Sequence, residues 1–168
     1  DGRSGFHPDR TEPRVDVFQA IPGMRSSILW ATERPPVVPG DGADPVPGLR
    51  SLHPVPGGSV FTTLTVPPDS TFPSPSFDPA AAAQEHARLA PGVAERIEPD
   101  VPGFFHTTDT LDYVVVLQGE IWLVTDEGEA RLGPGDCAVQ RGTRHAWHNH
   151  GETPATIAVV LLGASRSP

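Results

Sequence analysis

Short segments with apolar side chains at alternate positions fill the chain from residue 103 onward, and turn residues separate them. In the segment 120–124 (EIWLV), both alternating sets are apolar, so both faces of the strand are buried. One face would line the interior of a barrel and the other would meet a second sheet. Several short strands at this spacing predict an antiparallel sandwich or barrel. The further strands that we expect cover residues 113–118, 138–141, 145–149 and 156–162.

The first hundred residues have a different character, because most of the 21 prolines lie there. We expect residues 1–58 to form an irregular arm with wrapping loops that holds at most a short strand at 26–32. The barrel should then occupy residues 59–163 of a single domain, with a strand at 59–66. An insertion of loop and short helix is expected at about 67–102, and its helix should span 78–90. In that helix Asp78 is a suitable N-cap and Pro79 a suitable first residue.

Composition excludes several classes of function. The formal charge of -9 argues against a nucleic-acid partner, which needs a basic face. All twelve basic residues are arginine, so Schiff-base chemistry on lysine is excluded. Cys137 is the only cysteine, so no internal disulfide forms, and its strand-like surroundings predict that it is buried. No apolar run is long enough to span a membrane, and no phosphate loop or dinucleotide fingerprint is present. We therefore expect a cytoplasmic protein without a nucleotide cofactor.

Two motifs stand out in the second half of the chain. Residues 103–119 have the form G-x2-H-x-T-x3-D-x6-G, and residues 135–149 have the form G-D-x4-R-G-x2-H-x3-N. Together they resemble the paired motifs of the cupin superfamily, whose first motif is normally H-x-H-x3-4-E-x6-G and whose second supplies a further histidine. The resemblance covers residues 100–163. It implies a single jelly-roll β-barrel of the all-β class that holds a metal or a small molecule inside.

The resemblance also identifies candidate ligands residue by residue. His106 stands at the first histidine position and His145 at the last, while Asp112 replaces the usual glutamate and Thr108 the second histidine. Two imidazoles and a carboxylate suit Fe(II), Mn(II), Ni(II) or Zn(II). We therefore predict that His106, Asp112 and His145 bind one divalent transition metal. Asp109 ranks second as the carboxylate, because strand alternation turns it away from His106.

Other residues are weighed against ordinary structural roles. We predict that Tyr113, Gln140 and Trp147 line the substrate pocket, and that Trp122 does so less. His86, on the predicted helix, should be exposed, and so should His148 and His150, which precede or lie in a turn. His7 and His53 belong to no motif.

Two functional hypotheses remain open. The first is a metal-dependent enzyme acting on an oxygenated or aromatic metabolite, as a decarboxylase, lyase, cyclase, isomerase or dioxygenase. The wording DTLDYVVVLQGE and VQRGTRHAW looks like a cupin subgroup found in secondary metabolism, which supports this hypothesis. The second is a metal-free cupin, either a ligand-binding protein or an acid–base enzyme that uses His145 and Asp112. In both cases we expect a homodimer, because sheet edges invite pairing and dimers are the commonest closed assembly.

Overall fold

The computed structural model describes residues 13–99, 101 and 103–166. Nine β-strands, one α-helix and three short 3-10 helices lie within these residues, and every strand pairing is antiparallel. Residues 1–12 of the predicted irregular arm, with His7, lie outside the described residues. The all-β class with one short helix is confirmed.

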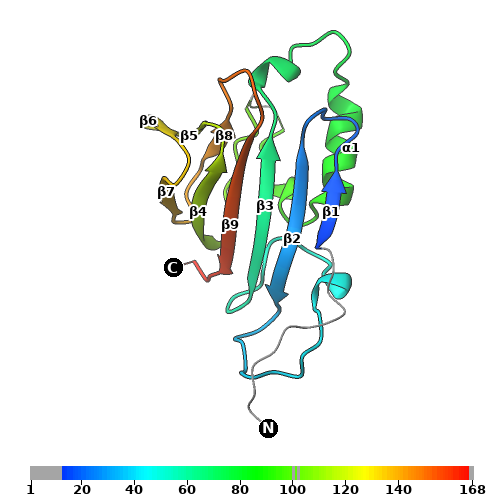
Figure 1. The fold of residues 1–168 in the computed structure, drawn as a ribbon, viewed down its shortest axis with the longest axis vertical. Helices are drawn as coiled ribbons and strands as arrows, with labels where there is room; N and C mark the ends of the chain where they lie inside the picture. Colours follow the sequence, from blue (N-terminus) through cyan, green and yellow to red (C-terminus); the bar gives the residue numbers. More distant parts are fainter. Residues whose placement is uncertain (1–12, 100, 102, 167–168) are drawn as a thin grey trace.

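The larger sheet has six strands in the order β1-β2-β3-β9-β4-β7, and it forms the broad face in Figure 1. The smaller sheet has three strands in the order β6-β5-β8. In chain order the strands are β1 (Arg14–Val17), β2 (Arg25–Thr32), β3 (Ser59–Val66), β4 (Thr110–Gln118), β5 (Ile121–Thr125), β6 (Gly128–Leu132), β7 (Cys137–Gln140), β8 (Ala146–His148) and β9 (Ala155–Gly163).

A core cluster joins the two sheets. Val114 and Val116 of β4 pack with Ile157 of β9 and with Ile121 of β5, which is fully buried. Alternation along β4 explains why Val114 and Val116 are the residues that enter the core, because every second residue from Thr110 to Val116 is buried. The two sheets therefore share one interior, as the predicted jelly-roll barrel requires.

The larger sheet begins earlier than the predicted boundary at residue 59. Strand β2 pairs with β3 along almost its whole length, and β1 pairs with β2. Without β2, the edge of β3 would carry unpaired backbone groups, so the segment 25–32 covers it. Ile28 and Ala31 of β2 are buried in a second core cluster with Val60. Part of the predicted arm is thus integral to the sheet.

The helix α1 (Pro79–Leu89) matches the predicted helix. The Asp78 carboxylate accepts hydrogen bonds from the backbone N–H groups of Ala80 and Ala81, at 2.9 and 3.1 Å, as an N-cap should. The helix lies beyond β1, at the end of the sheet far from β7 (Figure 1). It buries the stripe Ala82, His86 and Leu89, which are spaced to share one face.

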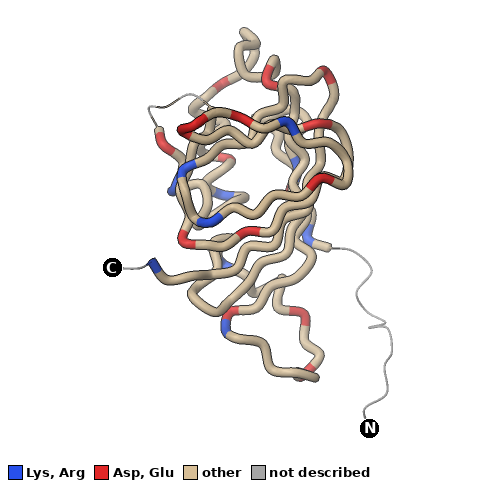
Figure 2. Tube along the Cα trace, turned by 90° about the vertical axis from the view of Figure 1, so that its left-hand side faces the viewer, with Lys and Arg blue, Asp and Glu red and all other residues tan. Residues whose placement is uncertain are grey.

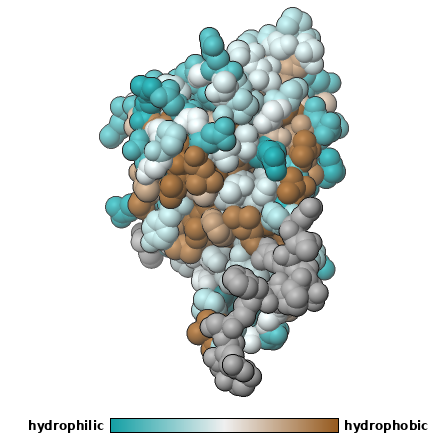
Figure 3. Space-filling view, in the orientation of Figure 1, coloured by the Kyte–Doolittle hydropathy of each residue, from teal (hydrophilic) through white to brown (hydrophobic). Residues whose placement is uncertain are grey.

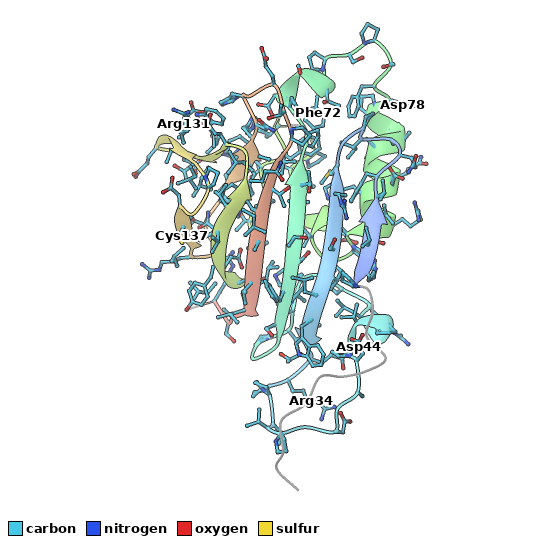
Figure 4. All side chains as sticks on the ribbon, viewed as in Figure 1. Arg34, Asp44, Phe72, Asp78, Arg131 and Cys137 are labelled. Atoms are coloured by element: carbon cyan, nitrogen blue, oxygen red, sulfur yellow. The ribbon has the colours of Figure 1, made fainter. Side chains whose placement is uncertain are left out.

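The prediction that His86 is exposed is therefore wrong, because His86 belongs to that buried stripe. The prediction that Cys137 is buried is also wrong. On β7 the inward-facing residues are Ala138 and Gln140, so Cys137 faces outward with Val139 (Figure 4). The 3-10 helices η1 (Val46–Gly48), η2 (Asp69–Thr71) and η3 (Ala94–Arg96) lie in the connections.

The outer face of the larger sheet carries a row of apolar side chains. Successive cross-strand partners from β2 to β7 form it: Trp30, Phe61, Val160, Tyr113 and Val139. All but Val160 are large exposed apolar or aromatic residues, and Figure 3 shows apolar surface gathered over this face. We call these five residues the apolar row.

Charged residues are not gathered on one face as the apolar row is. Arginines and acidic residues are scattered around the trace without a basic face (Figure 2). In the part of the chain that the structure describes, no helix is long and apolar enough to cross a membrane.

Candidate functional site

A pocket of about 360 Å³ lies in the interior and reaches toward helix α1. Its walls are mostly apolar, and the large sheet and the connections between strands supply them. Leu64, Val66, Phe72, Phe104, Val114 and Trp147 are among the lining residues. No arginine of the described residues lines it, whereas His86, His106, Asp112, Gln140 and His145 do.

His106 and His145 form an antiparallel bridge of their own. The backbone N–H of each residue donates to the carbonyl of the other, at 2.9 and 3.0 Å, and the ring centroids lie 4.3 Å apart. The two motifs, far apart in the sequence, are therefore joined at their histidines.

The rings of both histidines are oriented in the same way. His106 Nδ1 lies 2.9 Å from the carbonyl of Phe104, and His145 Nδ1 lies 2.9 Å from the carbonyl of Thr143. A carbonyl only accepts, so each Nδ1 carries the proton and each Nε2 keeps a lone pair. Phe104 has a φ of 62°, which is uncommon for a residue with a side chain, and its carbonyl orients His106.

Asp112 supplies a buried carboxyl group to the same pocket. The residue is 4% exposed, and its Oδ1 has no hydrogen-bond partner among the described residues. Burial raises the pKa of Asp112 to about 6, although a hydrogen bond with Thr110 opposes the shift. A buried carboxyl oxygen without a partner is costly in a closed protein, so a proton, a ligand or a metal would stabilise it.

Both histidines are held neutral near neutral pH. Burial and, to a smaller extent, the nearby His106 lower the pKa of His145 to about 4, while the Thr143 carbonyl opposes the shift. Burial also lowers the pKa of His106. Neutral imidazoles with a lone pair on Nε2 are the form that binds metals or accepts protons. In donor type, two neutral imidazoles and an unpartnered carboxyl oxygen suit a divalent transition metal.

The remaining residues predicted to line the pocket divide into two groups. Gln140 and Trp147 line it, as predicted. Tyr113 does not, because Asp112 faces inward and alternation turns Tyr113 to the outer face, where it is 46% exposed. Trp122 is not among the lining residues either.

Residues near the first motif have structural partners. Thr108 is buried in the pocket wall and accepts a hydrogen bond from Thr110, at 2.8 Å. Asp109 forms ion pairs with Arg166 and Arg96. The Asp109 backbone N–H donates to His53 Nε2, at 3.0 Å. Asp109 is thus engaged away from the pocket, and His53 has a structural role that no motif indicated.

A second polar cluster lies where η2 meets the end of β8. Asp69 Oδ2 is 3.0 Å from His148 Nδ1 and 2.9 Å from His150 Nδ1. Among the described residues this is the only group of three His, Cys, Asp or Glu side chains with ligand atoms all within 4.8 Å of one another. His106, Asp112 and His145 are not that close together. The described residues therefore contain two candidate metal sites, one formed by His106, Asp112 and His145 and one at the pocket wall, where Asp69 and His148 are lining residues.

The Asp69 cluster differs in part from the sequence prediction. His150 is exposed, as predicted, but His148 is only partly exposed and lines the pocket. Alternation predicts that His148 points away from His145, but at the end of β8 the His148 ring contacts Asp69 of η2 and lines the pocket from there. Nothing in the sequence indicated Asp69, whereas the spacing of Ala82, His86 and Leu89 could have revealed His86.

Comparisons with known proteins agree with the two motifs. The family model described as a cupin domain matches residues 93–161. Phomopsin biosynthesis cluster protein C' of Diaporthe leptostromiformis is 41% identical over 99 residues, covering 55% of this chain and 52% of that protein. The cupin-domain-containing oxidoreductase virC of Hypocrea virens is 41% identical over 68 residues, covering 38% of this chain and 35% of that protein. The match therefore spans about half or less of either relative.

Among solved structures, a Cupin 2 conserved barrel domain protein from Salinispora arenicola is 12% identical with a TM-score of 0.44, covering 96% of this chain and 90% of that one. We draw nothing further from a resemblance at that level. The family match, the curated relatives and the antiparallel sheets together identify residues 93–161 of this chain as a cupin domain.

Proposed function

We propose that this protein is an enzyme of secondary metabolism that uses a divalent transition metal in its pocket to act on a small, largely apolar molecule. The observation that carries the proposal is the pair of identically oriented histidines beside a buried carboxyl oxygen that lacks a partner. His106, Asp112 and His145 would hold the metal. Such a metal would act as a Lewis acid toward an oxygen atom of the substrate.

The residues of the chain prepare this site. The carbonyls of Phe104 and Thr143 hold the two rings in the tautomer that leaves Nε2 available. Gln140 Oε1 accepts hydrogen bonds from Arg141 N–H and from the Thr143 hydroxyl, at 2.7 and 2.9 Å. Gln140 therefore positions the segment whose carbonyl orients His145. Contacts that hold a metal ligand in its orientation in this way strongly affect metal affinity.

The apolar walls determine what the site accepts. They exclude water from the reacting atoms, which strengthens electrostatic interactions inside the pocket. The names of the relatives, a cupin-domain-containing oxidoreductase and a biosynthesis cluster protein, favour an oxidation in secondary metabolism over the lyase and isomerase alternatives.

A second candidate function is acid–base catalysis without a metal. It is favoured by the pKa of Asp112, about 6, and by the distance among the three pocket ligands, which do not close to within 4.8 Å. In this alternative Asp112 donates a proton when protonated and His145, held neutral by its low pKa, accepts one.

Metal titration of untagged, chelator-treated protein distinguishes the two functions. Fe(II), Mn(II), Ni(II) and Zn(II) would each be added, and bound metal and the unfolding temperature measured. We expect about one metal per chain in the wild type and none in His145→Gln. The matched control is His150→Gln, which should keep the metal. If His150→Gln loses it instead, the metal site is at Asp69, and if the wild type binds none, the acid–base alternative stands.

A further inference from the structure

Three buried polar residues in the pocket come from outside the cupin domain, and one of them, Thr62, already donates to the carbonyl of Ser27. The other two are Ser26 and His86. Ser26 lies on β2 and His86 on α1, and both precede the matched residues 93–161. Both line the same pocket as His106, Asp112 and His145. The amino-terminal half of the chain therefore contributes polar groups to an otherwise apolar cavity.

Ser26 is 5% exposed, and it shares the inward face of β2 with Ile28. Its hydroxyl oxygen has no hydrogen-bond partner among the described residues. A buried hydroxyl without a partner lowers stability, so its presence in a pocket wall points to a ligand group that it meets.

His86 is 9% exposed and packs edge-to-face against Phe18, with ring centroids 5.5 Å apart. Its ring forms no hydrogen bond with another described residue, although it lines the pocket. Burial lowers the pKa of His86, and His106 contributes, which places the two rings within electrostatic reach. A neutral imidazole offers one donor and one acceptor to a ligand.

We propose that Ser26 and His86 determine substrate specificity by hydrogen bonding to a neutral polar group, such as a hydroxyl or a carbonyl, at the end of the substrate remote from Asp112. The substrate class is then an uncharged molecule with an apolar middle and an oxygen function at each end. The lining supports the absence of negative charge, because no arginine of the described residues reaches the pocket to pair with a carboxylate or a phosphate.

The inference rests on the proposed function only in taking this pocket as the substrate site, so its test uses binding alone, with and without metal. Three probes share a phenol and differ at the end of a propyl chain: para-propylphenol, the corresponding terminal alcohol and the corresponding carboxylic acid. Isothermal titration would measure their dissociation constants. We expect wild-type protein to bind the alcohol about tenfold more tightly than para-propylphenol and to bind the acid most weakly.

The variants Ser26→Ala and His86→Phe should each remove most of that preference for the alcohol while still binding para-propylphenol. His86→Gln should restore part of it, because an amide still offers a hydrogen bond. Gln84→Ala, an exposed position on the same helix, is the control and should behave as wild type. Ser26→Ala should not lower the unfolding temperature, so loss of preference cannot be ascribed to misfolding.

Equal binding of the alcohol and para-propylphenol by wild type would overturn the inference, and so would tightest binding of the acid or no binding of any probe. The metal titration could show that the wild type binds no metal. If that protein still prefers the alcohol, the result supports the inference and contradicts the proposed metal function. The two proposals therefore fail separately.

Discussion

His106 and His145 face each other across a single antiparallel bridge, and each ring donates its Nδ1 proton to the carbonyl two residues earlier in its own motif. Each cupin motif thus contains the same arrangement, a histidine whose ring donates to the carbonyl two residues before it, and the bridge joins the two arrangements. This arrangement fixes both tautomers before any ligand arrives, which is the preorganisation that a metal or proton-transfer site requires.

The buried carboxyl of Asp112 makes stability depend on pH in metal-free protein. Its folded pKa of about 6 lies above the ordinary value of 3.8, so the folded state holds this proton at higher pH than the unfolded state. The contribution of Asp112 to stability is present below that ordinary value and is lost as the pH rises through 6. The side chain of Asp112→Asn stays neutral at every pH. As the pH rises from 3.8 to above 6, the unfolding free energy of the variant minus that of wild type should therefore increase by about 3 kcal/mol.

Urea unfolding of both proteins with a chelator, at several pH values, measures this difference. His145, with a pKa of about 4, titrates in the same window, but both proteins contain it, so its effect largely cancels. A difference between wild type and Asp112→Asn that does not change with pH would show that the carboxyl is not desolvated as described.

Asn149 has a structural role, although it ends the second motif. Its side chain is fully buried, donates to the carbonyls of Val66 and Thr153 at 3.1 and 2.9 Å, and accepts from the N–H of Gly151 at 3.0 Å. Asn149→Ala leaves these groups without partners, so we expect unfolding free energy to fall by about 3 kcal/mol or more. Denaturant unfolding checks this against the exposed control Gln84→Ala. A loss below about 1 kcal/mol would contradict the assigned role.

Much of the barrel could be predicted because alternation and the two motifs are local signals. The strands at 59–66, 113–118 and 156–162 and the helix at 78–90 all appear near their predicted bounds. Tyr113 and Cys137 were misplaced because register, which decides the face of each residue, depends on pairing between strands that lie far apart in the sequence.

The parts of the site contributed from outside the motifs were not predictable in the same way. Asp69 meets His148 across 79 residues of sequence, and His86 reaches the pocket only because α1 packs beside β1. No periodicity records such contacts. The sequence therefore indicates the ligands on the barrel strands but not the residues that close the pocket around them.

The apolar row suggests how two copies would associate. We predict that this face of the larger sheet forms the interface of a homodimer, since the five residues of the apolar row are uncharged and four of them are exposed. Val139, 60% exposed at the β7 end of the row, is the position to change.

Val139→Glu places a carboxylate in that interface and should convert the dimer to a monomer in sedimentation at micromolar concentration. The same substitution at Val37, an exposed loop position outside the row, is the matched control and should leave the dimer intact. A monomeric wild type, or a dimer that Val139→Glu does not weaken, would refute the interface.

Gln140 offers a test of positioning rather than direct contact. Gln140→Leu removes the acceptor for Arg141 and Thr143, so the segment that orients His145 loosens. We expect metal affinity to fall by about tenfold to a hundredfold with the barrel still folded. Gln140→Glu keeps an acceptor oxygen and should retain most of the affinity. Equal affinity in Gln140→Leu and wild type would show that Gln140 does not position His145.

The location of the metal tests the central claim most directly. Crystals of untagged protein loaded with Co(II) would give an anomalous difference map that reports metal position without assuming any ligand. We predict one strong peak within bonding distance of His106 Nε2 and His145 Nε2, with Asp112 as the third protein ligand. A peak at Asp69, His148 and His150 with none in the pocket, or no peak at all in protein that remains active, would contradict the proposed metal site.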